Sequence, residues 1–191
     1  MKKLLKVAIF AILIVLFIYF GTRDYKIEKK KKIDEKNASS ILLDDGYLFT
    51  EINHSKVLNK ISSKNDAIIY FCIDGNELCT KYGLLIDEVF KTFDVNEIYY
   101  YDIKEDRENN NGTYQKILTY LTDYLITDDL GEQDLHAPSL LFIKNGNIYA
   151  FDDELSIIHG AIDIDKIWNE EVINAKREYL TEVIGGYLGN E

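Results

Sequence analysis

The chain has 191 residues, of which 33 are acidic, 22 are basic and two are cysteines. This length allows one domain with a hydrophobic core and one appendage, and two cysteines are too few for a disulfide scaffold. Residues 33–191 hold 31 of the acidic but only 13 of the basic residues, a formal net charge of −18. Such an acidic body excludes nucleic acid as a partner. The three histidines, at 54, 136 and 159, show no metal-ligand spacing, so we expect no metal and no cofactor.

The N-terminus predicts a membrane segment. A basic head, MKKLLK, precedes an uninterrupted apolar run of 14 residues from Val7 to Phe20. A membrane-spanning helix needs about 20 residues, and Leu4 and Leu5 extend the run if Lys6 snorkels. No small-residue cleavage site follows, since the exit reads FGTRDYK. We therefore expect residues 1–22 to form an uncleaved signal-anchor; a cleaved signal peptide is the alternative.

Residues 23–40 are polar and lysine-rich and predict a charged tether. The tether either contacts anionic lipid headgroups or is a solvated stalk. A simple count of lysine and arginine would place the C-terminal side in the cytoplasm. However, a short basic head resembles a signal sequence, and long domains translocate largely regardless of charge. We expect a single-pass protein of the cell membrane whose globular domain, residues 41–191, lies outside the cytoplasm.

The first half of the globular part alternates strand and helix patterns. Residues 46–52 alternate as a short strand, and a helix capped by Asn53 or Ser55 follows. DAIIYFCI, residues 66–73, is a nearly continuous apolar run that predicts a buried central strand. Residues 77–93 have helical apolar spacing, and residues 97–103 are rich in strand-forming residues.

The second half predicts a helix at 113–126, a polar loop, a hairpin and a terminal helix. Residues 138–153 read as two strands that turn at Asn145-Gly146. Residues 163–188 read as one long helix capped by Asp163 or Asp165. The order β-α-β-α-β-α-β-β-α calls for parallel pairing followed by an antiparallel hairpin. We therefore expect an α/β fold with a mixed sheet and helices on both faces.

Both cysteines lie in FCIDGNELCTKYG, residues 71–83. Cys79 falls in the first turn of the expected helix, where unpaired N–H groups and the helix dipole favour a thiolate. The alternative is a small side chain packed under the helix. Cys72 lies within the buried strand, where packing in the core is the stronger interpretation. A disulfide between the two forms only if the intervening loop brings their Cα atoms within about 7 Å.

The element order and two local features resemble the thioredoxin-like superfamily. The features are a buried strand leading into a helix that begins near Cys79, and PSLLFIKNG, residues 138–146, which is similar to the family's proline-strand-glycine element. More narrowly, the chain resembles the membrane-associated bacteriocin transport accessory proteins of Gram-positive bacteria. The similarity covers roughly residues 47–161. The C-x-x-C motif is incomplete, because Tyr82 stands where the second cysteine would be.

The resemblance implies a site around Cys79, with Cys79 as the candidate nucleophile and Cys72 as a weak candidate partner. It also implies that Pro138 is cis and lies beside the cysteine, with Tyr82, His136 and Ala137 as candidate binding residues. Two functions follow from this. One is a membrane-anchored accessory factor in thiol/disulfide exchange or protein export; the other is a non-catalytic module that binds a partner protein or peptide. The oligomeric state stays open.

The remaining polar and aromatic residues read as packing and surface. The tyrosines at strand and helix spacing predict core and sheet packing rather than a binding surface. The acids of the second half show no calcium-loop spacing and read as a solvated surface. They are Asp102, Glu105, Asp106, Asp123, Asp128, Asp129, Asp152 and Asp153.

Overall fold

A computed structural model describes residues 41–127, 133–153 and 164–189 of the chain. The predicted signal-anchor (1–22), the tether (23–40) and Asp128 and Asp129 lie outside this part. The strands are β1 (Phe49–Glu51), β2 (Ala67–Cys72), β3 (Ile98–Asp102), β4 (Ser139–Lys144) and β5 (Asn147–Asp152). The helices are η1 (Ile41–Leu43), α2 (His54–Ser62), α3 (Glu77–Lys91), α4 (Lys104–Glu108), α5 (Gly112–Leu121), α6 (Ile164–Ile167) and α7 (Glu170–Leu188).

The strands form one mixed five-stranded sheet in the order β1-β3-β2-β4-β5. β1 and β2 each pair with β3 in parallel, and β4 pairs antiparallel with both β2 and β5. Parallel strands need crossover helices, and α2 and α3 provide them. The predicted mixed sheet, with its parallel first half and antiparallel hairpin, is confirmed.

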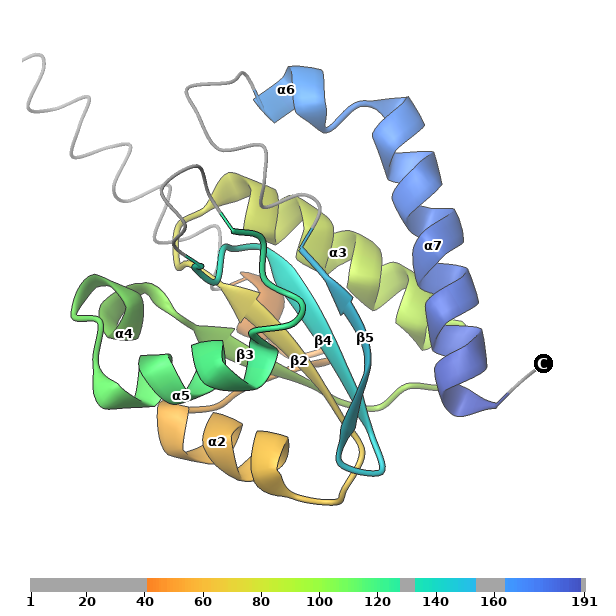
Figure 1. The fold of residues 1–191 in the computed structure, drawn as a ribbon. Helices are drawn as coiled ribbons and strands as arrows, with labels where there is room; N and C mark the ends of the chain where they lie inside the picture. Colours follow the sequence, from red (N-terminus) through yellow and green to blue (C-terminus); the bar gives the residue numbers. More distant parts are fainter. Residues whose placement is uncertain (1–40, 128–132, 154–163, 190–191) are drawn as a thin grey trace, which may run out of the picture.

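Helices cover both faces of this sheet (Figure 1). Helix α3 packs against α7 on one face, and α2 packs against α5 on the other. β2 lies at the centre, and every one of its residues is buried. A strand covered on both faces needs an apolar side chain at nearly every position, which is why AIIYFC shows no alternation.

Asparagine caps fix where the longer helices begin. The Asn53 carboxamide accepts from the Lys56 N–H at 3.1 Å, so Asn53 rather than Ser55 is the cap of α2. The terminal helix departs from the prediction, because α6 and α7 are separate helices divided at Trp168. Asn169 caps α7 by accepting from the Val172 N–H at 3.1 Å. The cap of α7 is thus neither of the predicted residues, of which Asp163 lies outside the described residues; an asparagine side chain that accepts from a helical N–H starts a new helix at this point.

Two other boundaries differ from the prediction. The helix expected to reach residue 126 ends at Leu121, and the short helix α4 was missed. The hairpin turn is confirmed: Asn145 and Gly146 both have positive φ, at 54° and 78°. This is the pair of left-handed residues that a tight hairpin turn requires. Among the described residues, no helix is long and apolar enough to cross a membrane.

Candidate functional site

Cys79 lies in the first turn of α3, as the sequence predicts. Asn76 caps the helix, and its side-chain oxygen accepts from the Cys79 N–H at 3.0 Å. The cap therefore uses one of the N–H groups that a thiolate would otherwise face. Glu77 in the same turn forms an ion pair with Lys81 at 3.1 Å.

The Cys79 side chain points back toward the end of β2 and has no exposed surface. Its Sγ accepts from the Ile73 N–H at 3.4 Å. Its carbonyl accepts from the Tyr70 hydroxyl at 2.6 Å. Both contacts hold the first turn of α3 against the strand, so a reagent reaches this thiol only when the turn opens. Cys79 is therefore a small side chain packed under the helix, and its use as a nucleophile stays a prediction.

Cys72 is also fully buried, at the C-terminal end of β2. Its Sγ lies 3.6 Å from the Ile73 carbonyl oxygen. Burial, followed by hydrogen bonding with the Cys79 side chain, raises the pKa of Cys72 well above its usual value. The two thiols are therefore neighbours, but neither forms a disulfide in the structure.

Tyr82, three residues after Cys79, is buried where the family motif has its second cysteine. Its ring packs edge-on against Tyr70 and Trp168, with centroids 6.1 and 6.2 Å away. Its hydroxyl donates to the carboxylate of Asp152 at the end of β5. Tyr82 is thus part of the packing between α3, the sheet and the C-terminal segment.

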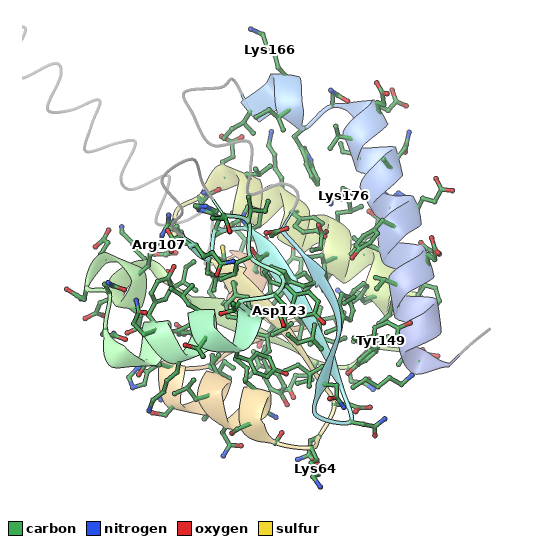
Figure 2. All side chains as sticks on the ribbon, in the orientation of Figure 1. Lys64, Arg107, Asp123, Tyr149, Lys166 and Lys176 are labelled. Carbon is green, nitrogen blue, oxygen red and sulfur yellow. The ribbon has the colours of Figure 1, made fainter. Side chains whose placement is uncertain are left out.

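The carboxylate that Tyr82 contacts belongs to a buried ion pair. The Lys176 ammonium on α7 lies 2.8 and 3.1 Å from the two oxygens of Asp152, and Figure 2 labels Lys176. Lys176 is 5% exposed and Asp152 is 6% exposed. We call Tyr82, Asp152 and Lys176 the buried triad. The sequence prediction that Asp152 belongs to a solvated surface was wrong, because the tyrosine and the lysine compensate the buried charge.

Asp106 on α4 is a second exception to the solvated-acid prediction. It is 8% exposed and accepts from the Tyr101 hydroxyl and the Asn111 amide. His54 lies 3.9 Å from the same carboxylate. Burial and the Asp106 carboxylate together raise the pKa of Tyr101. The signal available in the sequence was an acid five residues after a strand tyrosine, on the short helix α4 that follows the strand.

Pro138 is buried at the start of β4, beside the end of β2. In the antiparallel register Phe71 pairs with Ser139, so one further step along both strands places Pro138 opposite Cys72. The Ala137–Pro138 peptide bond is cis, as the resemblance implies. Ala137 has no exposed surface, so its side chain is packed rather than presented to a ligand.

His136 is half-buried in the loop before Pro138, where Arg107 holds it. The Arg107 guanidinium on α4, labelled in Figure 2, lies 3.3 Å from His136 Nδ1. The same guanidinium contacts Asp134 at 2.6 and 2.9 Å. Tyr114 also donates to the Asp134 carboxylate, and the loop is thereby attached to α4 and α5. No local pattern indicated a role for Arg107, because helix α4 was not predicted.

The arrangement brings together Cys72, Cys79 and Pro138 at one end of the central strands. It provides two neighbouring buried thiols but no thiol three residues after Cys79. Within residues 41–127, 133–153 and 164–189, no group of three or more histidine, cysteine or carboxylate side chains is placed to hold a metal ion. Conventional dithiol exchange through C-x-x-C is therefore impossible in this chain. Packing of Cys79 in the core and contact with a partner protein do not need a second thiol.

Comparisons with known proteins give structural neighbours only. No family model and no curated protein matches the sequence. Among solved structures, the chain is similar to thioredoxin O2 from Arabidopsis thaliana in the oxidised state, with 16% identity and a TM-score of 0.37 over 68% of this chain and 94% of that one. Thioredoxin O1 from the same plant gives 17% identity and a TM-score of 0.36 over 62% and 90%. The fold assignment depends on the strand order and helix packing described above.

Proposed function

We propose that this chain is a membrane-anchored thioredoxin-like accessory protein that binds a partner protein or peptide in protein export and does not catalyse dithiol exchange. The observation that carries the proposal is Tyr82. A resolving cysteine is absent at this position, and the tyrosine that replaces it is buried and hydrogen-bonded to Asp152. A site under selection for dithiol exchange would keep the second thiol, since it releases the mixed disulfide.

The charge of the globular part favours a basic partner. Residues 33–191 carry a formal net charge of −18, which attracts cationic surfaces and repels acidic ones. The contact surface we propose surrounds the first turn of α3 and the loop before Pro138. Arg107 and His136 lie in that region, where the Arg107 guanidinium is paired with the Asp134 carboxylate.

Membrane anchoring and location outside the cytoplasm are parts of the same proposal. They are supported by the apolar run from Val7 to Phe20 and its basic head. Residues 1–22 would span the membrane, 23–40 would tether, and 41–191 would form the binding domain.

The first test measures catalysis. Purified chain is added to a protein disulfide that dithiothreitol reduces slowly, and the reduction rate is followed by turbidity. We expect the same rate as with dithiothreitol alone. A Cys79→Ser variant is the matched control, because it removes the candidate nucleophile while keeping the size of the side chain. A rate that rises with the chain and falls with Cys79→Ser would refute the non-catalytic proposal.

The second test measures partner binding. Three peptides of equal length with net positive, zero and net negative charge are titrated against the chain at low and high salt. We expect binding of the cationic peptide alone, weakened by salt because exposed charges are screened within about 8 Å at physiological ionic strength. Equal binding of all three, or binding of none, contradicts a charge-directed partner site.

A second candidate function is thiol exchange by Cys79 acting alone. Its position in the first turn of α3 favours this reading, since a helix N-terminus favours the thiolate. In a Cys72→Ala variant, the rate of Cys79 alkylation by a small reagent separates the two. A thiol that reacts only after denaturation excludes the exchange function.

A further inference from the structure

The two cysteines contact the backbone of one residue, Ile73, which lies between them in space. The Ile73 N–H donates to Cys79 Sγ at 3.4 Å, and the Ile73 carbonyl oxygen lies 3.6 Å from Cys72 Sγ. Seven residues separate the cysteines in sequence, so the contact results from the way the loop returns α3 to the end of β2. Two thiols are thus buried together with no water-exposed surface on either.

The geometry is within reach of a disulfide. The Cα of Cys72 is two covalent bonds, of about 1.3 and 1.5 Å, from the Ile73 nitrogen. Cys79 Sγ therefore lies within about 6.2 Å of that Cα, by adding these bonds to the 3.4 Å contact. A disulfide needs the two sulfurs in bonding contact and the two Cα atoms about 4.4–6.8 Å apart. Closure requires a local shift of the first turn of α3 and no change in the sheet.

A buried tyrosine beside the pair is unsatisfied. Tyr100 is 2% exposed, and its hydroxyl has no hydrogen-bond partner among the residues that the structure describes. Cys72 is the neighbour that, after burial itself, does most to raise the pKa of Tyr100. In return, the Tyr100 hydroxyl opposes the rise in the pKa of Cys72. A buried hydroxyl without a hydrogen-bond partner calls for an explanation, and a neighbouring thiol that can accept its hydrogen bond on ionising supplies one.

We propose that Cys72 and Cys79 form a reversible intrachain disulfide by exchange with a small external disulfide, with Tyr100 as the positioning donor for the Cys72 thiolate. Cys79 loses its proton and attacks one sulfur of the external disulfide, whose S–S bond breaks and releases one thiolate. The Cys72 thiolate then attacks Cys79 Sγ, the Cys72–Cys79 bond forms, and the second external thiolate leaves. The two protons lost by the cysteines end on the two released thiols, and the external disulfide gains two electrons.

This inference is independent of partner binding. Because the thiols are buried, the first attack requires opening of the α3 first turn, and the product would fasten that turn to β2 covalently. The disulfide would stabilise the first turn of α3 and would not take part in turnover of a substrate. If the peptide titration shows no binding, the intrachain disulfide can still form. If no disulfide forms, the proposal of partner binding still stands.

The test uses the full chain, whose only thiols are these two. The protein is incubated with mixtures of reduced and oxidised glutathione, quenched in acid, alkylated in denaturant and weighed by mass spectrometry. We expect a monomer that has lost both alkylation sites and regains them with dithiothreitol. Loss of neither site, a disulfide-linked dimer, or a glutathione adduct as the end product would each overturn the proposal.

Variants assign the roles. Cys72→Ser should stop at one glutathione bound to Cys79, whereas Cys79→Ser should remain unmodified over the same time. Tyr100→Phe keeps the ring but removes the hydroxyl, and it should accumulate the glutathione adduct as an intermediate because the second step slows several-fold. Circular dichroism verifies that each variant is folded. An intermediate level equal to that of the unmutated chain would remove Tyr100 from the proposal, and a disulfide that forms only in urea would overturn the pairing itself.

Discussion

The buried ion pair between Lys176 and Asp152 makes a quantitative prediction. Replacing Lys176 by methionine keeps the length of the side chain but removes the ammonium that lies 2.8 and 3.1 Å from the two carboxylate oxygens. The carboxylate then stays at 6% exposure with the Tyr82 hydroxyl as a donor but without its counter-charge. Removing one partner of a buried pair costs about 3–5 kcal/mol. We expect a loss of this size in the free energy of unfolding.

The assay is urea unfolding at neutral pH, followed by fluorescence and circular dichroism together. A loss of about 3–5 kcal/mol is a large part of the total stability of a domain, about 5–15 kcal/mol, so the variant should unfold at a much lower urea concentration. The next residue of the same helix provides the control. Arg177 contacts Glu88 at 2.7 Å, with side chains 40% and 63% exposed, and Arg177→Met should cost under about 1 kcal/mol.

The difference between the Lys176→Met and Arg177→Met variants tests whether the ion pair is buried in solution. If Lys176→Met costs no more than Arg177→Met, the triad is solvated in solution and the reasoning about buried charge is refuted. An Asp152→Asn, Lys176→Met double variant tests it further. Removing both charges should restore part of the stability, because no uncompensated charge remains.

Two other predictions follow from the structure and one from the sequence. Gly83→Ala places a Cβ 2.5 Å from a methyl group of Leu42, and since that methyl can rotate away we expect a loss of about 1–2 kcal/mol in urea unfolding. Burial raises the pKa of Tyr187, so above about pH 10 this tyrosine ionises in the unfolded chain but keeps its proton in the folded one. The free energy of unfolding should therefore be unaffected below about pH 10 and fall above it by up to about 1.4 kcal/mol per pH unit for each such tyrosine. The stability of Tyr187→Phe should depend less on pH in this range. Ile14→Arg combined with Phe17→Arg should release the chain from membranes in a sedimentation assay, because each arginine costs about 2.5–3.5 kcal/mol at the centre of a span; leucine at both positions is the control, and unchanged sedimentation argues against a spanning segment.

Much of the sheet could be predicted because local patterns and topology agree. The apolar run of β2 has only one environment that suits it, and Asn145-Gly146 has only one common use between two strands. Alternation of strands and helices then requires parallel pairing. The break at Trp168 was missed because apolar spacing continues across it, and only the side-chain cap of Asn169 separates α6 from α7.

The polar contacts of the site could not be predicted, because they join residues that are far apart in sequence. Tyr82 and Asp152 are 70 residues apart, and Asp152 and Lys176 are 24 apart. An acid at the end of a strand looks solvated until its partners are known. The same holds for Arg107, which contacts a loop 27 residues later. Sequence pattern reports which face of an element is apolar, and not which buried charge has a partner.

Tyr82 explains why restoring the motif would not restore the chemistry. A Tyr82→Cys variant completes C-x-x-C, but it removes a ring packed between Tyr70 and Trp168 and takes away the hydroxyl that Asp152 accepts from. The shorter cysteine side chain would not reach Asp152, so the carboxylate would lose its hydroxyl donor and the volume of the ring would be left as a cavity. Position 82 is therefore packed as a unit with β5 and α7. A second thiol at position 82 would support dithiol exchange only with further changes at Asp152 and Lys176.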